Sequence, residues 1–354
     1  MAADKAVRGR FFEDFRLGER IVHPTPRTVG EGEAALYLGL TGSRFPLASA
    51  DTAARALGLA RRPLDELLAF HVAFGKTVPD VSLNAVANLG YAEVRFLGPV
   101  WPGETLRAES EVIGLRPNRD GRAGIVWVRS RAFAQDGREV LAWVRWVMVR
   151  RRKPGGGGPE AVVPETADHV PPQALPVPEG LHGRGYDTAL TGSPWLWEDY
   201  EPGERIVHPA GMTIDETDHT LATRLYQNNA RVHFDAHAMA SSRFGRRLVY
   251  GGHVISVCRA LSFEGLANAV WIAAINGGTH ANPVFAGDTL YCRSEVLARW
   301  ALPGRDDLGA LRVRTLGLKD CDPATVDEPR DGEGRYRPEV VLDLDYTVLM
   351  PRRR

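Results

Sequence analysis

The run Gly18-Glu19-Arg20-Ile21-Val22-His23 occurs a second time, residue for residue, as Gly203-Glu204-Arg205-Ile206-Val207-His208. The two copies lie 185 residues apart (203 − 18). Farther along the chain, residues 99–106 correspond to residues 283–290, with a spacing of 184 between their glycines (287 − 103). Similar segments at a nearly constant spacing indicate an internal duplication. The sequence therefore predicts one fold present twice, as an N-terminal repeat over residues 8–152 and a C-terminal repeat over residues 191–354.

Residues 153–190 separate the two repeats. They begin with Lys153-Pro154 and four glycines, and they remain rich in proline up to about Gly185. This composition is typical of a linker between compact units. We expect the linker to cross the surface of the protein and to pack little.

Each repeat contains one apolar, helix-like segment and several strand-like segments separated by turn signals. The predicted helices cover residues 66–74 and 252–265, and the predicted strands cover residues 91–96, 105–115, 124–134, 140–149, 273–276, 289–299, 310–318 and 340–349. A polar insert, residues 319–338, is predicted to be a surface loop. One buried helix with a meander of strands implies an α+β fold, in which an antiparallel sheet wraps around the helix. We expect the two sheets to join side by side, with both helices on the concave face.

The composition argues against several classes of protein. The 354 residues are enough for two domains, and 44 basic residues balance 44 acidic ones, whereas nucleic-acid-binding proteins usually show a basic excess. No apolar run approaches the length of a membrane span, and the first residues lack the apolar core of a signal peptide. Cys258, Cys292 and Cys321 show no metal-site or disulfide spacing. A reduced, cytoplasmic chain without a metal is therefore expected.

Residues 225–235 combine amides, a histidine and a carboxylate within a short irregular stretch, and a glycine pair opens the next apolar segment. Polar groups on an irregular turn, followed by backbone N–H donors at a helix start, are typical of an active site. The candidate catalytic residues are His233, Asn228 and Asp235, and the candidate residues for oxyanion or substrate binding are Gly251, Gly252, Gln227 and Arg231.

Three segments, residues 10–18, 70–93 and 229–235, make the chain resemble the double hotdog proteins of the MaoC-like dehydratase group, and most closely the members that hydrate mesaconyl-CoA. The motif of the group, Gly-Asp-x-Asn-Pro-Leu-His, falls on residues 227–233, where only His233 is kept. In the first repeat it falls on residues 42–48. There the Gly, Pro and Leu are kept, but Ser43 and Ala48 replace the Asp and His. We therefore expect one active site per chain, in the second repeat.

The resemblance implies a hydro-lyase that reversibly hydrates mesaconyl-CoA to β-methylmalyl-CoA, with one repeat carrying the chemistry and the other shaping an acyl-CoA tunnel. It implies an acyl-CoA thioester as substrate and no cofactor, because CoA is part of the substrate. A homo-oligomer without nucleic-acid or membrane partners is expected. The alternatives are a MaoC-like hydratase for straight-chain enoyl-CoA, a non-catalytic acyl-CoA-binding protein, and a thioesterase.

His233 is expected to shuttle the proton, since the ordinary pKa of an imidazole is roughly 6.5. Asn228 replaces the usual aspartate and cannot act as a base, but its amide can position water or the β-hydroxyl. The N–H of Gly252 would bind the enolate oxygen.

Each of these roles has a structural alternative. His233 could be a structural histidine, Asn228 a turn residue, and Asp235 either a hidden base or a helix N-cap. The glycine pair could serve helix–sheet packing. Three further histidines, His71, His253 and His280, are expected to lie in the core or to line the tunnel. The histidines of the repeated run, His23 and His208, are interpreted as structural, and Arg231 and Arg243 could contact the CoA phosphates or a substrate carboxylate.

Overall fold

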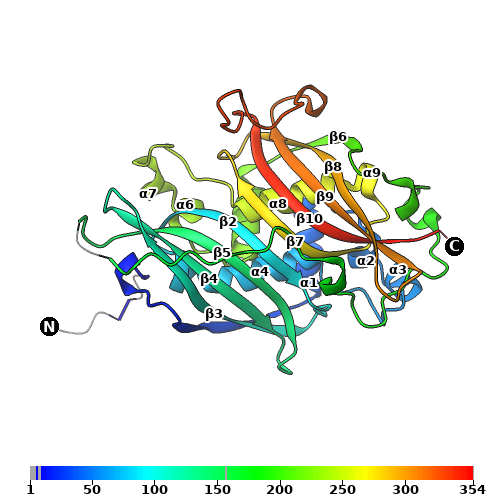
Figure 1. Cartoon of the computed structure of the whole chain (residues 1–354), viewed down its shortest axis with the longest axis horizontal. Helices are drawn as coiled ribbons and strands as arrows, with labels where there is room; N and C mark the ends of the chain where they lie inside the picture. The colour runs from blue at the N-terminus through cyan, green and yellow to red at the C-terminus, as the bar shows by residue number, and fades with distance from the viewer. Residues whose placement is uncertain (1–4, 7–8, 156–157, 354) are drawn as a thin grey trace.

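The computed structural model describes residues 5–6, 9–155 and 158–353. Ten strands in these residues form one antiparallel sheet in the order β1-β3-β4-β5-β2-β7-β10-β9-β8-β6 (Figure 1). Their bounds are Arg20–Val29 (β1), Ala85–Phe96 (β2), Glu104–Pro117 (β3), Ala123–Phe133 (β4), Glu139–Arg150 (β5), Arg205–Thr213 (β6), Trp271–His280 (β7), Thr289–Ala301 (β8), Leu308–Lys319 (β9) and Val340–Pro351 (β10). The predicted α+β class and the predicted continuous sheet are both confirmed.

The helices lie mainly on one face of this sheet (Figure 1). Their bounds are Glu31–Thr41 (α1), Pro46–Ser49 (α2), Asp51–Ala56 (α3), Glu66–Thr77 (α4), Glu216–Leu225 (α5), Arg231–Phe234 (α6), Ala236–Ala240 (α7), Gly251–Leu261 (α8) and Phe263–Leu266 (α9). The predicted central helices correspond to α4, which ends three residues later than expected, and to α8, which ends earlier. The chain bends after α8 because Glu264 and Gly265 leave helical geometry, Gly265 with a φ of 110°.

An approximate two-fold axis relates the two repeats. Ala92 of β2 pairs with Gly277 of β7, and these positions differ by the repeat spacing (277 − 92 = 185). Behind the sheet, Nε2 of His71 on α4 lies 2.9 Å from Oγ of Ser256 on α8, again 185 residues apart. Equivalent residues can contact each other only near the axis that relates them. The two sheets and the two central helices therefore meet at this axis.

The repeated run forms the two edge strands, β1 and β6, which were not predicted as strands. Prolines interrupt both strands, and an edge strand tolerates them because one side of its backbone needs no partner. His23 and His208 turn inward, where their Nε2 atoms each lie 2.8 Å from a serine hydroxyl of the next strand, that of Ser110 and that of Ser294. Their structural interpretation is confirmed.

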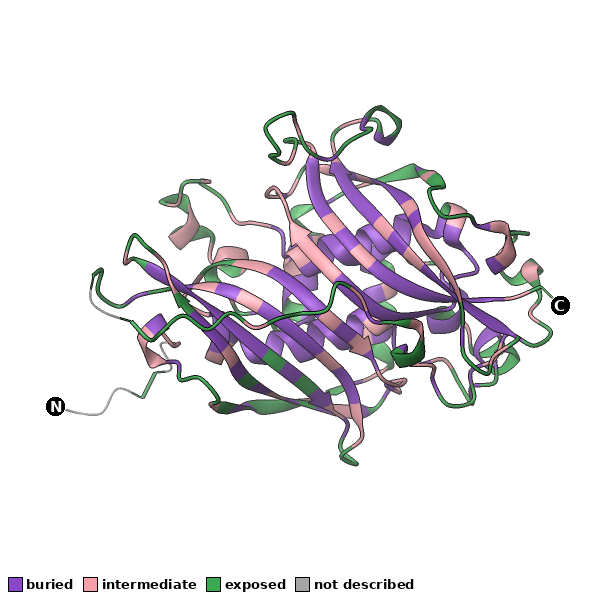
Figure 2. Ribbon diagram, viewed as in Figure 1, coloured by how far each residue is buried: buried purple, intermediate pink, exposed green. Residues whose placement is uncertain are grey.

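The core lies between the concave face of the sheet and helices α4 and α8, as the buried residues in Figure 2 show. Trp143 of β5 and Phe70 of α4 pack there edge to face, with ring centroids 5.8 Å apart. None of the helices in the described residues is long and apolar enough to cross a membrane.

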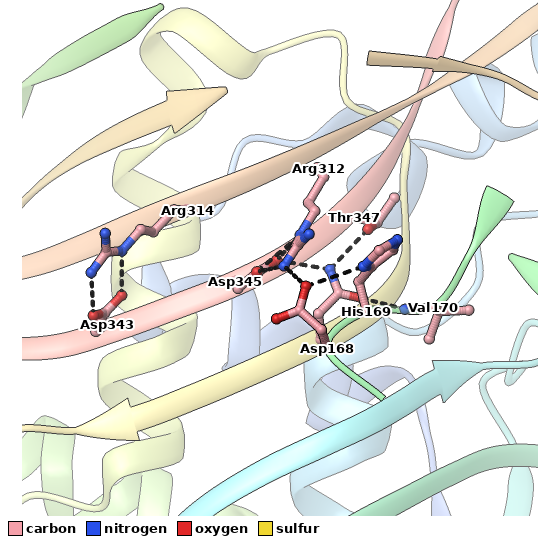
Figure 3. Close-up of polar contacts among 9 residues, drawn as sticks. Asp168, His169, Val170, Arg312, Arg314, Asp343, Asp345 and Thr347 are labelled. Carbon is pink, nitrogen blue, oxygen red and sulfur yellow. Dashed lines mark hydrogen bonds and ion pairs between the residues drawn. The ribbon is translucent and has the colours of Figure 1, made fainter. Parts of the chain in front are cut away.

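The linker crosses the outer, convex face of the sheet (Figure 1) and packs against it more than expected. The N–H of Val170, a buried residue, donates to Oδ1 of Asn276 at 3.0 Å. Figure 3 shows Arg312 of β9 between Asp168 of the linker, at 3.0 Å, and Asp345 of β10, at 2.6 Å. The expectation of little packing is wrong here, because side chains of the sheet supply partners for the linker.

Candidate active site

His233 lies on the short helix α6, in the segment that leads to α8. Its Nδ1 donates a hydrogen bond to the carbonyl oxygen of Leu248 at 2.9 Å. A carbonyl can only accept, so the ring proton is on Nδ1 and the lone pair is on Nε2. The ring also packs edge to face against Tyr250, with centroids 5.6 Å apart. The Leu248 carbonyl and the Tyr250 ring together orient the imidazole.

Burial lowers the pKa of His233 to about 4, although the hydrogen bond to Leu248 acts in the opposite direction. The neighbouring imidazole of His219 lowers this pKa further. His233 is therefore neutral at pH 7, and its Nε2 can accept a proton. The geometry gives it the properties of a general base.

The start of α8 has free backbone donors. Tyr250 is the N-cap residue and provides no side-chain cap. Among the described residues, no hydrogen-bond acceptor is found for the N–H of Gly251 or of Gly252. These donors lie at the positive end of the helix dipole, where a negative charge is stabilised.

Aromatic rings surround the two glycines. A Cβ on Gly251 would lie 2.5 Å from the His280 ring, and a Cβ on Gly252 would lie 2.5 Å from the Tyr250 ring and 2.7 Å from the His71 ring. Both positions therefore require glycine for packing, as the alternative interpretation suggests. The same close packing brings imidazole and phenol rings next to the free N–H groups.

His280, at the end of β7, is the main site residue whose role the sequence left open. Its Nε2 lies 3.2 Å from the hydroxyl of Tyr91 on β2, a residue of the first repeat. Burial lowers the pKa of His280 to about 4, and the nearby His233 contributes to this shift. Two neutral imidazoles therefore lie close to the start of α8. Only the pairing of β2 with β7 brings Tyr91 and His280 together.

Three further histidines, His71, His219 and His253, are buried in the same region. His219 of α5 is almost fully buried, and neither ring nitrogen has a hydrogen-bond partner in the described residues. Nδ1 of His253 lies 3.5 Å from the hydroxyl of Tyr226. Burial keeps the pKa of His71 well below its usual range. In the residues that the structure describes, no three His, Cys, Asp or Glu side chains are grouped as metal ligands.

Asn228 and Gln227 shape the turn that precedes α6. Oδ1 of Asn228, a buried residue, accepts a hydrogen bond from the N–H of Ala230 at 3.2 Å. Gln227 is exposed and has a left-handed backbone with φ of 53°, at the motif position where the first repeat has Gly42 with φ of 64°. Asn228 is thus a turn residue, as the alternative proposes, and its Nδ2 can still donate.

Asp235 and Arg231 lie at the ends of short helices. Oδ1 of Asp235 accepts from the N–H of Ala238 at 2.9 Å, so Asp235 is the N-cap of α7. Arg231, the first residue of α6, is exposed. The structure thus brings His233, Gly251 and Gly252 together. It leaves Arg231 and Gln227 at the surface.

The chain is similar to known proteins along nearly its whole length. Residues 2–325 match the sequence profile of the mesaconyl-CoA hydratase family. The β-methylmalyl-CoA dehydratase of Chloroflexus aurantiacus is 59% identical over 349 residues, which cover 99% of each chain. The mesaconyl-CoA hydratase of Cereibacter sphaeroides is 56% identical, over 98% of this chain and all of that protein (100%).

Solved structures agree with the fold. The crystal structure of a MaoC domain protein dehydratase from Chloroflexus aurantiacus superimposes with a TM-score of 0.96 at 58% identity, over 99% of this chain and 100% of that one. A Mycobacterium tuberculosis protein with a double hotdog fold superimposes with a TM-score of 0.76 at 26% identity, over 97% and 99% of the two chains.

Proposed function

The chain belongs to the mesaconyl-CoA hydratase family, and we propose that it reversibly hydrates mesaconyl-CoA to β-methylmalyl-CoA at the start of α8. The observation that carries this proposal is a neutral histidine with its lone pair on Nε2, held near a helix start whose first N–H groups are free. A hydro-lyase acting on a thioester needs both a base and oxyanion donors.

In the dehydration direction, Nε2 of His233 takes the α-proton of the thioester. The electron pair of the broken C–H bond then forms an enolate, whose oxygen accepts hydrogen bonds from the N–H groups of Gly251 and Gly252. As the enolate collapses, the α–β double bond forms and the bond to the β-hydroxyl breaks. The imidazolium returns its proton to the hydroxyl, which leaves as water. Hydration follows the same steps in reverse.

Asn228 supports this chemistry through the backbone. Its Oδ1 closes the turn that precedes α6, the helix that carries His233. Its Nδ2 can donate to the leaving hydroxyl or to the attacking water, which would add a positioning effect. Asp235 is committed to capping α7 and takes no part in the proposed steps.

Incubation with mesaconyl-CoA tests the proposal, since hydration removes the conjugated enoyl-thioester absorbance. Faster turnover of a straight-chain enoyl-CoA would favour the other MaoC-like hydratase activity. Release of free CoA thiol would indicate a thioesterase. Binding of mesaconyl-CoA without any change in absorbance would indicate an acyl-CoA-binding protein.

We further propose a reducing, cytoplasmic setting and a reaction with no cofactor besides the CoA of the substrate. In support, Cys258, Cys292 and Cys321 are all free thiols, and the first two are buried. The homo-oligomer stays a prediction. Val22 and Val207, at equivalent positions of the two edge strands, are exposed apolar side chains that such an assembly could cover.

A further inference from the structure

Arg145 of β5, in the first repeat, is a fully buried cation without a carboxylate partner among the described residues. Its Nη2 donates to Oγ1 of Thr77 at 2.7 Å, its Nη1 lies 3.4 Å from Oγ of Ser82, and its guanidinium stacks over the Phe74 ring at 4.2 Å. All three partners are uncharged. Its Nε is buried and has no hydrogen-bond partner in the described part of the chain.

Two other arginines of the same sheet have carboxylate partners. Arg312 and Arg314 on the convex face each form two-pronged ion pairs, with Asp345 and Asp343 respectively (Figure 3). Burial of a charge is costly unless an opposite charge compensates it, and arginine is rarely fully buried without a partner. Burial lowers the pKa of Arg145 to about 10, so the side chain is still cationic at neutral pH. The charge of Arg145 thus has no compensating anion among the described residues.

Arg145 lies close to the candidate active site, which indicates where its missing anion would come from. Arg145 is the cross-strand partner of Tyr91, whose hydroxyl lies 3.2 Å from Nε2 of His280. His280 in turn packs on Gly251 at the start of α8. A continuous row on the concave face therefore runs from Arg145 to the candidate active site.

Tyr250, which packs on His233, extends this row. The centroid of its ring lies 6.0 Å from that of Phe74. The Arg145 guanidinium stacks over this same Phe74 ring. Burial raises the pKa of the Tyr91 and Tyr250 phenols, and the positive charge of Arg145 opposes this rise in both. The hydroxyl of Tyr250 is buried and, like Nε of Arg145, has no hydrogen-bond partner among the described residues. This row therefore contains two buried donors without a partner among the described residues, Nε of Arg145 from the first repeat and the Tyr250 hydroxyl from the second.

We propose that Arg145, together with the Tyr250 hydroxyl, binds the free carboxylate of a dicarboxylic acyl-CoA substrate and so determines specificity for it. This inference rests on the proposed function. In mesaconyl-CoA two carbons separate the thioester carbonyl from the free carboxylate, so one end can bind at the start of α8 while the other meets Arg145. A carboxylate has two oxygens, which can accept from Nε of Arg145 and from the phenol. Arg145 of the first repeat then helps to select the substrate that the second repeat converts.

The test compares mesaconyl-CoA with 2-methylcrotonyl-CoA, which has a methyl group in place of the free carboxylate. We expect Arg145→Gln to lower the ratio of kcat/KM for the two thioesters by about 10²-fold or more, because a buried polar group that loses its partner discriminates strongly. Arg145→Lys keeps the charge but not the planar fork, so it should restore part of the ratio. Arg312→Gln, on the convex face, is the matched control and should leave the ratio unchanged.

A structural role for Arg145 would lower both activities together and leave the ratio within about three-fold of wild type, which would overturn the inference. If Arg145→Gln does not fold, the same two thioesters are compared with Arg145→Lys and Tyr250→Phe. A kcat/KM ratio that stays unchanged in both variants would overturn the inference. Wild-type protein that converts neither thioester would overturn the proposed function, and this inference with it. An active wild type with unchanged ratios in the variants would overturn the inference alone.

Discussion

Helices α4 and α8 occupy equivalent places in the two repeats, yet their first turns differ. In α4, Oδ1 of Asp65 accepts a hydrogen bond from the N–H of Leu67 at 2.9 Å. In α8 the equivalent residues are Tyr250 and Gly252 (65 + 185 and 67 + 185), and no side chain caps the helix. The first repeat thus fills its helix start with its own carboxylate. In the second repeat the corresponding donors have no acceptor among the described residues.

The turns before these helices show the same contrast. Helix α2, Pro46–Ser49, and helix α6, Arg231–Phe234, are equivalent at the 185-residue spacing. Their backbones correspond, but a buried Ala48 takes the place of His233. Both repeats keep this backbone, but only the second has a histidine at this position. This difference supports the proposal of one active site per chain.

The first repeat still contributes to the candidate site. His71 packs on Gly252, and Tyr91 contacts His280. Both contacts cross the approximate two-fold axis, so neither repeat could form this site alone. The first repeat therefore contributes contacts to the candidate site although it lacks the histidine.

Replacement of His233 should have the largest effect. Without its general base, the His233→Ala variant should lose about 10²–10⁴-fold in kcat with mesaconyl-CoA. His237, an exposed histidine four residues later, provides the control, and His237→Ala should keep normal turnover. Near-native activity of His233→Ala would remove the main distinction between the repeats and direct the search for a base elsewhere, first to Asp235.

A methyl group at Gly252 should have the next largest effect. The new Cβ would displace the Tyr250 or His71 ring from the helix start, and disturbance of an oxyanion donor typically lowers kcat by about 10²–10³-fold. Gly39→Ala, in the exposed part of α1 where a Cβ meets no atom within 4 Å, is the control. It should keep full activity and gain about 0.5–1 kcal/mol of stability. Equal activity of the two variants would contradict the proposal that the N–H groups at the start of α8 bind the enolate oxygen.

The pH dependence should follow the lowered pKa of His233. Because the base form persists down to a pKa of about 4, kcat/KM should stay level between pH 7 and pH 5 and should fall only as the pH approaches 4. An unperturbed histidine would already lose half of its base form near pH 6.5. A profile of kcat/KM from pH 4 to pH 9 separates the two cases, once the protein is shown to remain folded. An acidic limb centred near pH 6.5 would show that the site is more solvated than the structure indicates.

Replacement of Glu66 should affect stability rather than catalysis. Burial, and then the charge of Asp65, raise the pKa of Glu66 from 4.5 to about 8. The folded protein therefore binds more protons than the unfolded chain between these values, and stability falls as the pH rises through this window. Glu66→Gln can still accept the hydrogen bond from the N–H of Ile272. We expect a higher Tm than wild type at pH 9, little difference at pH 4, and unchanged turnover per folded molecule. A loss of turnover at unchanged Tm would mean that the first repeat takes part in the chemistry.

Local patterns predicted the two central helices and eight of the ten strands, but they missed the edge strands β1 and β6 and the full length of the irregular strands β2 and β7. The strand predicted at residues 91–96 begins earlier, at Ala85. The sequence pattern missed its first part because bulges near Ala87 and Asn88 break the alternation of apolar and polar residues. On β7, the predicted strand at residues 273–276 stops before Gly277 and Gly278. They lie inside the strand, where a Cβ on Gly278 would come within 3.2 Å of the Tyr91 ring. In both cases the irregular residues lie near the contact between the repeats.

The sequence by itself determined the duplication, the α+β class and the location of His233 beside a helix that starts with two glycines. These features depend on residue types at short spacings, which a single chain displays directly. Only the tertiary structure decided that Tyr91 meets His280, 189 residues away. It also decided that Arg145 pairs across the strands with Tyr91 and has no carboxylate partner among the described residues. The pairing of β5 with β2 and of β2 with β7 sets these contacts, and a shift of one residue in either register would turn the side chains to the opposite face. Register depends on the packing of the whole sheet on α4 and α8, and no short stretch of the sequence encodes it.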